Sequence, residues 1–195
     1  MFGRQNHSKD APPFFAALFE QYKNLVYKTA FLMLGEVEEA EEALQEVFVL
    51  VYRSLDSYNP QKGALTTWLH RITVNYCLGQ RRKRRPDWLP VDEELAESSS
   101  FTDPDFSALS EREAMIQAIR QLGEKLQVVV ILRYYWELPY AEIAQILEIP
   151  LGTVKSRIDL AIRSLRQILT GQAETSAPVL PLNSLVQEEV RRCRL

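Results

Sequence analysis

The stretch YAEIAQILEIPLGTVKSRIDLAIRSL, Tyr140–Leu165, has the spacing of a helix-turn-helix. Pro150 blocks continuation of a first helix, and Gly152-Thr153 offers a flexible entry and a hydroxyl cap for a second helix. Six residues have the spacing of a small core between the two helices, with a small alanine where the helices would touch: Ile143, Ala144, Leu147, Ile149, Val154 and Ile158. This stretch therefore predicts an all-α fold built from short packed helices.

The second of these helices carries side chains that suit contacts with DNA. They are of the types that reach base edges and phosphates from the major groove: Thr153, Lys155, Ser156, Arg157 and Arg163. An ordinary helical hairpin would explain the apolar residues but not this cluster of polar ones. One position departs from the ideal, because the turn usually has a glycine with positive φ and Glu148 stands there, at a cost of about 1 kcal/mol.

The N-terminal half shows the same helical periodicity. Apolar residues recur every three or four positions from Pro13 to Ala30 and again over Glu38–Ser54, and the cluster Asp56–Pro60 predicts a turn after them. A third helix is expected to begin near Ala64–Thr66 and to stop at Pro86. The chain is therefore expected to be all-α, with two small helical domains.

Charge is segregated along the chain although the net charge is only −3. Residues 61–85 carry seven basic side chains and no acid, whereas residues 86–108 carry seven acids and no base. Solvated helix faces are the alternative interpretation, but the five consecutive cations at 81–85 repel one another and favour a counter-charge. This pattern indicates a local nucleic-acid footprint that the net charge conceals.

These observations predict four parts: a first domain over 1–85, a flexible acidic linker over 86–108, a helix-turn-helix domain over 109–170 and a tail over 171–195. Several apolar residues between Leu182 and Arg194 could form one face of a short helix. The tail could dock back on the domains, contact a partner or remain disordered.

Other functional classes lack their usual motifs. The only cysteines and histidines are Cys77, Cys193, His7 and His70, too few for a disulfide framework or a normally spaced zinc site. A phosphate-binding loop and a nucleophile–base pair are also missing, so the sequence predicts no enzyme activity, no metal and no cofactor. Neither a signal peptide nor a run of about 20 apolar residues is present, which predicts a cytoplasmic protein.

Two sets of motifs resemble the sigma factors of bacterial RNA polymerase, specifically the small extracytoplasmic-function (ECF) group of the sigma-70 family. TVKSR after EIAQIL, preceded by LRYYWELPY, resembles the fourth conserved region of that family. EEALQEVFVLVYRSLDSYNP followed by GALTTWLHRITVNYCLGQRRKRR is similar to the second conserved region. The resemblance covers about residues 14–85 and 109–169. The family often has aspartate at the position of Gly79, a departure that bears on base choice in the first domain. It often has proline at the position of Gly123, a departure that bears only on a helix start.

The resemblance implies a dissociable subunit that binds core RNA polymerase and directs promoter recognition, DNA opening and transcription initiation. It places the polymerase contact on the helix Glu38–Arg53, through Leu44, Gln45, Glu46, Phe48, Tyr52 and Arg53. It places the proximal promoter element, held as melted single-stranded DNA, against Lys62, Thr66, Thr67, Arg71, Asn75, Arg81 and Arg82. Trp68 could be a core residue or a stacking platform for a base.

The distal element would be read as duplex by the helix-turn-helix, through the five residues given above. An anti-sigma protein that covers these surfaces is a further expected partner. An autonomous helix-turn-helix regulator, which would bind DNA without polymerase, is the alternative function.

Overall fold

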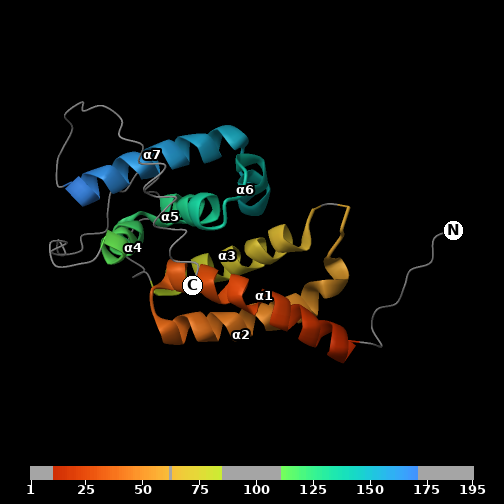
Figure 1. Ribbon diagram of the computed structural model, residues 1–195. Helices are drawn as coiled ribbons and strands as arrows, with labels where there is room; N and C mark the ends of the chain where they lie inside the picture. Colours follow the sequence, from red (N-terminus) through yellow and green to blue (C-terminus); the bar gives the residue numbers. More distant parts are fainter. Residues whose placement is uncertain (1–10, 62, 85–110, 171–195) are drawn as a thin grey trace. The chain divides into compact units, whose positions relative to one another are not determined.

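The computed structural model describes residues 11–61, 63–84 and 111–170 (Figure 1). All secondary structure assigned in these ranges is helical, as the sequence predicted. The chain divides into two compact units, Met1–Arg84 and Arg85–Leu195, and each is described separately. Both the expected linker and the expected tail helix lie outside the described residues. Within the described ranges, no helix is long and apolar enough to cross a membrane.

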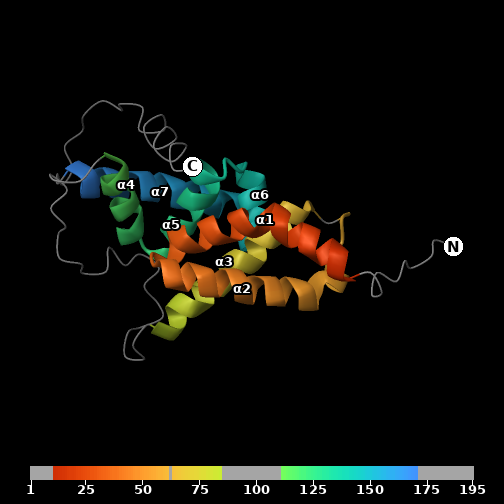
Figure 2. The same ribbon diagram turned by 60° about the horizontal axis from the view of Figure 1, so that its bottom comes forward.

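The first unit is a bundle of three helices: α1 (Ala11–Leu34), α2 (Val37–Ser54) and α3 (Leu65–Arg84). All three pack against one another, and α1 and α2 lie side by side in both ribbon views (Figures 1 and 2). Gly35 ends α1 in the left-handed conformation, with φ at 98°, which a glycine adopts without steric cost. The turn predicted over Asp56–Pro60 overlaps a short 3-10 helix, η2 (Leu55–Ser57), and continues beyond it.

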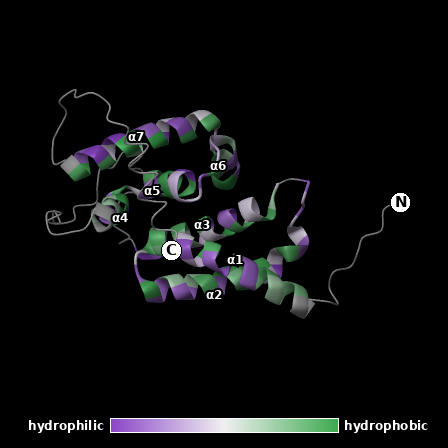
Figure 3. Cartoon of the chain, viewed as in Figure 1, coloured by the Kyte–Doolittle hydropathy of each residue, from purple (hydrophilic) through white to green (hydrophobic). Residues whose placement is uncertain are grey.

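The core of this unit is apolar and rich in aromatic rings. Phe48 of α2 lies at its centre, with ring centroids 6.1 Å from Phe15 and 4.8 Å from Phe19 of α1 in edge-to-face geometry. The fully buried members of the cluster come from all three helices: Leu18, Val26, Val47, Phe48, Val51 and Leu69. Figure 3 shows the hydrophobic and hydrophilic stripes that alternate along the helices, the pattern that packing on one face requires.

The second unit is built around a long helix, α7 (Leu151–Thr170), which packs on α4 (Glu111–Gln121), α5 (Glu124–Val130) and α6 (Tyr140–Leu147). Gly123 precedes α5 and accepts hydrogen bonds at its carbonyl from Leu126 and Gln127, both at 2.9 Å. This glycine therefore bears on a helix start, as the sequence indicated. A π-helical turn, η4 (Ile131–Tyr135), continues α5, and the amide of Trp136 donates to the carbonyl of Ile131 at 3.2 Å.

The helix-turn-helix differs from the sequence prediction at two points. The prediction that Gly152-Thr153 opens α7, with the threonine hydroxyl as its cap, was wrong. Helix α7 begins at Leu151, and the amides of Thr153 and Val154 donate to the carbonyl of Pro150 at 2.9 and 3.2 Å. Proline has no amide hydrogen to leave unsatisfied at a helix start and holds φ near the helical value, which explains the earlier start.

The inner face of α6 also differs from the prediction. Ile146, which the prediction omitted, is buried together with Ile143, whereas Ala144 and Leu147 are only half-buried. From α7, Val154 and Ile158 are buried as expected. The short helix turns Ile146 inward because three-residue and four-residue spacings are both compatible with one helical face.

Candidate nucleic-acid interface

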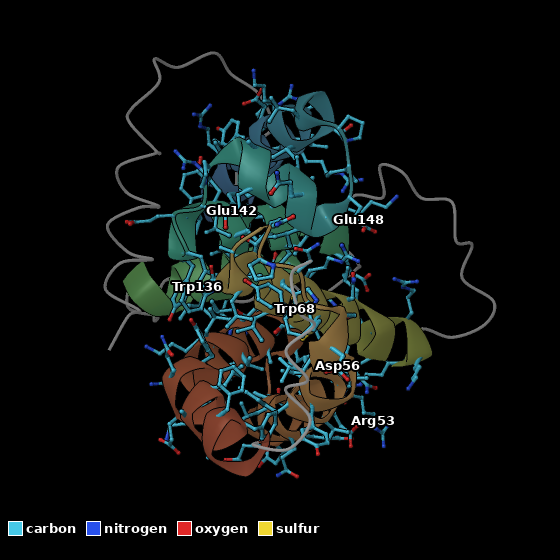
Figure 4. All side chains as sticks on the ribbon, turned by 90° about the vertical axis from the view of Figure 1, so that its right-hand side faces the viewer. Arg53, Asp56, Trp68, Trp136, Glu142 and Glu148 are labelled. Carbon is cyan, nitrogen blue, oxygen red and sulfur yellow. The ribbon has the colours of Figure 1, made fainter. Side chains whose placement is uncertain are left out.

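The turn between α6 and α7 sets the direction in which α7 leaves the helix-turn-helix. Glu148 ends α6 in the left-handed conformation, with φ at 54° and ψ at 41° (Figure 4). The amides of Glu148 and Ile149 both donate to the carbonyl of Ala144, so the end of α6 is closed by backbone hydrogen bonds. A glutamate thus occupies a position at which glycine is ordinarily favoured, as the sequence indicated.

The solvent side of α7 carries a straight line of four exposed residues, which we call the α7 stripe: Gly152, Ser156, Asp159 and Arg163. Their spacing of four, three and four places them on one helical face. The opposite face is buried and consists of Val154, Ile158, Ala161 and Leu165. The exposed face of α7 is therefore free of contacts that would hide it within its own unit.

The sequence-predicted distal residues divide between the α7 stripe and its flanks. Ser156 and Arg163 belong to the stripe, and Ser156 donates its hydroxyl to the carbonyl of Thr153 at 3.0 Å. Lys155 is exposed on one flank, whereas Thr153 and Arg157 are half-buried on the other. The prediction omitted Asp159, although its spacing from Ser156 and Arg163 is a signal that the sequence contains.

A second line of residues runs along the outer face of α3, and we call it the α3 stripe: Trp68, Arg71, Asn75, Gly79 and Arg82. Its spacing of three and four residues again defines one helical face. Arg71, Asn75 and Arg82 are exposed, so two cations flank an amide that can pair with a base edge. The structure thus brings together three of the residues predicted for the proximal element.

The burial of Trp68 is compatible with both roles that the sequence left open. It is half-buried against the core cluster, and its ring centroid lies 5.4 Å from that of Tyr58. The Tyr58 hydroxyl donates to the carbonyl of Gly63 at 3.3 Å, which ties the ring pair to the loop before α3. A ring that is held in place while partly exposed is suited to stacking on a base.

Other predicted proximal residues lie apart from the α3 stripe. Arg81 is half-buried, and its Nη1 donates to the carbonyl of Met33 at 3.4 Å, at the end of α1. Thr66 and Thr67 are half-buried in the first turn of α3, and Lys62 lies outside the described residues. Arg84, in the same basic run, forms an ion pair with Glu39 of α2.

Both stripes contain a helical glycine for which the chain supplies no steric reason. A Cβ atom built on Gly79 or on Gly152 would meet nothing within 4 Å. Gly79 lies in the interior of α3, where glycine costs about 1 kcal/mol relative to alanine, whereas Gly152 lies in the first turn of α7. The missing side chains leave space in which a DNA backbone can approach the helix closely.

The residues predicted to bind polymerase lie on α2 and divide by burial. Gln45, Glu46, Tyr52 and Arg53 are exposed, and Figure 4 shows Arg53 extending away from the bundle. Leu44 is half-buried. Phe48 is only 3% exposed, so its prediction as a contact residue was wrong: it packs between Phe15 and Phe19 inside the core.

Val49 and Leu50 form exposed apolar surface on α2, whereas Phe48 is buried. Each is 39% exposed, and Tyr52 is 56% exposed. We define the α2 face as the polar and apolar side chains that surround Val49: Gln45, Glu46, Val49, Tyr52 and Arg53. Apolar side chains inside a polar rim are typical of a protein-docking surface.

Known families match both units. The profile of sigma-70 region 2 matches residues 18–86, and that of sigma-70 region 4 matches residues 112–165. The chain is 34% identical over 167 residues to the ECF RNA polymerase sigma factor SigW of Bacillus subtilis, covering 80% of this chain and 88% of that protein. It is 37% identical over 151 residues to the ECF RNA polymerase sigma-E factor of Escherichia coli, covering 71% of this chain and 76% of that protein.

Solved structures share the fold. The sigma factor RpoE from Bartonella quintana, in complex with the anti-sigma factor NepR, matches with a TM-score of 0.60 at 20% identity, over 82% of this chain and 98% of that one. CnrH, in complex with the cytosolic domain of CnrY, also matches with a TM-score of 0.60, at 19% identity, over 82% of this chain and 89% of that one.

Proposed function

The chain belongs to the ECF group of the sigma-70 family, and from this premise we propose that it binds core RNA polymerase through the α2 face and promoter DNA through the α3 and α7 stripes. The observation that carries this assignment of surfaces is the pair of stripes, one on each unit. In both, exposed cations lie beside exposed groups that can pair with bases. As a sigma factor, the protein acts in promoter-directed transcription initiation.

In this proposal the α7 stripe reads the distal promoter element as duplex. A helix that is exposed along one face and held by a turn at its N-terminus is the part of a helix-turn-helix that enters the major groove. Arg163 supplies charge, and Ser156 supplies a hydroxyl that can still accept a hydrogen bond while it donates to Thr153.

The α3 stripe holds the proximal element after the strands separate. Arg71 and Arg82 bind phosphates on either side of Asn75, and the partly exposed ring of Trp68 stacks on an unpaired base. The protein needs no catalytic group for this step, because binding the separated strand lowers the free energy of the open DNA. We therefore infer a cytoplasmic binding subunit without enzyme activity of its own.

Core polymerase binds the α2 face, with Val49 and Tyr52 at the centre and Gln45, Glu46 and Arg53 around them. An anti-sigma protein is a further partner. Exposed apolar side chains on the first unit, at Phe14, Val37, Val49, Leu50 and Tyr52, support it because such groups gain stability when a partner covers them.

Reconstitution with core polymerase tests the proposal. The holoenzyme should transcribe from a cognate promoter, and Asn75→Ala and Arg163→Ala should each lower the initiation rate roughly tenfold, as expected for the loss of one specific contact. Asn24→Ala, at an exposed site of α1 that belongs to none of the three surfaces, is the matched control and should leave initiation unchanged.

Failure of the protein to bind core polymerase would overturn the proposed surfaces. Tight, sequence-specific binding to duplex DNA by the isolated protein, with no effect of added polymerase, would instead support the autonomous regulator.

A further inference from the structure

Asp159 is an acidic residue in the middle of a surface that otherwise suits an anionic partner. It belongs to the α7 stripe, three residues after Ser156 and four before Arg163, and it is exposed. The buried residues nearest to it in sequence, Ile158 and Ala161, point to the opposite side of α7. Asp159 therefore lies on the exposed side of α7, and within the unit its charge adds to burial and to Tyr140 in raising the pKa of Tyr134.

Charge alone makes an aspartate unfavourable at this position. A carboxylate that approaches the phosphates of DNA is repelled by them and must give up water as it enters the groove. The ordinary compensation would be an ion pair with Lys155 or Arg163, each four residues away on the same helix. Among the described residues, Asp159 forms an ion pair with neither of them.

A hydrogen bond from the edge of a base pair can also offset the cost of placing the carboxylate near DNA. In the major groove, cytosine presents only an amino donor at N4, whereas guanine and thymine present acceptor atoms. A carboxylate accepts hydrogen bonds and donates none, so it pairs with the amino group of cytosine and is repelled by the acceptors of guanine and thymine. Adenine offers a donor beside an acceptor, which an amide side chain matches better than a carboxylate does.

We propose that Asp159 is a specificity-determining residue, which accepts a hydrogen bond from the N4 amino group of a cytosine in the distal promoter element. This inference rests on the proposed function, because it requires that the α7 stripe enters the major groove. The adjacent cations bind the phosphates on either side, and Asp159 selects one base pair between them. Its contribution is therefore to discrimination rather than to affinity.

The test uses the full-length protein in holoenzyme with core polymerase and a promoter library whose upstream duplex is randomised. Transcribed templates of the unaltered protein should be enriched in cytosine at one base pair, by roughly tenfold over the other bases, as one good contact supplies. Asp159→Ala should abolish the preference at that base pair alone. Asp159→Asn, which is nearly isosteric and presents an amide, should move the preference to adenine at the same base pair.

Asn24→Ala, on the exposed side of α1, is the control and should leave the whole profile unchanged. An unchanged profile with Asp159→Ala would overturn the inference, and so would an equal change at every base pair, which would indicate a general charge effect. Thermal denaturation of the variants separates both results from loss of folding. If the unaltered holoenzyme shows no promoter-dependent transcription, the proposed function itself fails, whereas a selective holoenzyme that ignores residue 159 contradicts only this inference.

Discussion

Glu148 shows how one residue can support a binding geometry at a cost in stability. Its left-handed backbone, with φ at 54°, turns the chain from α6 into α7, and a side chain there is strained by contact with the following carbonyl. We predict that Glu148→Gly raises the free energy of unfolding of the second unit by about 1 kcal/mol. Urea denaturation measures the difference.

Gln145→Gly is the control for that substitution. Residue 145 is exposed in the interior of α6, where glycine has no conformational advantage, and the variant should lose about 1 kcal/mol. Destabilisation by both glycines would show that the contacts of the Glu148 side chain outweigh its backbone strain.

His70 makes the first unit sensitive to acid. It is 2% exposed on the buried side of α3, and burial lowers its pKa from 6.5 to about 4. Below pH 6.5 the histidine of the unfolded chain binds a proton, whereas that of the folded unit does not. The free energy of unfolding of the first unit therefore decreases as the pH is lowered from 6.5 to about 4. The pKa difference corresponds to a loss of about 3 kcal/mol.

The measurement is the pH dependence of denaturant unfolding for the unaltered protein and for His70→Gln. The carboxylates titrate in both proteins, so the difference between the two curves isolates the histidine. Parallel curves between pH 7 and pH 4 would show that His70 does not cause the acid sensitivity of the first unit.

At the scale of the element, α2 presents two different faces within three residues. Val47 is 0% exposed and Val49 is 39% exposed. The same substitution should therefore affect folding at Val47 and binding at Val49. We predict that Val49→Glu folds normally but weakens binding to core polymerase by at least about tenfold, because it puts a charge at the centre of the α2 face.

Val47→Glu is the companion variant. It buries a charge in the aromatic core and should unfold the first unit. Binding titrations and circular dichroism distinguish the two effects. Normal polymerase affinity of a folded Val49→Glu variant would show that polymerase binds elsewhere.

Helical periodicity predicted where the helices lie better than which side chains they expose. The all-α fold, the turn after α2 and the left-handed Glu148 follow from proline, glycine and apolar spacing, which are local signals. Phe48 and Tyr52 were both read as apolar contact residues, yet one is buried and the other exposed. Their difference depends on how α1 crosses α2, and this non-local packing cannot be read from the spacing within α2 alone.

The candidate binding residues were predicted by chemical type, which does not decide which of their side chains share one face of a helix. Arg71, Asn75 and Arg82 have suitable types and also share one face of α3. Arg81 has a suitable type but reaches the carbonyl of Met33, a contact that depends on the distant end of α1. Asp159 was omitted because its charge is unusual for a DNA-binding helix, although its spacing places it in the α7 stripe.

At the scale of the whole molecule, the chain has two compact units, each with buried apolar residues. We predict that they unfold independently. Leu69→Ala, at a fully buried position of α3, should destabilise the first unit by about 3 kcal/mol and leave the second unchanged. Trp68 and Trp136 report on the two units in variants that keep only one of them, and equal shifts of both signals would show that the units unfold together.

The division into two units also bears on how promoter preference can be inherited. In the proposed function, a substitution in the α7 stripe changes one reading surface and leaves unchanged the core cluster behind the other, whose members all lie between residues 15 and 76. Recombination that exchanges one half of the gene would therefore yield a protein that folds and that binds a new combination of proximal and distal promoter elements. Selection could then act on each half of the promoter separately, and a small set of such halves could generate many distinct regulons.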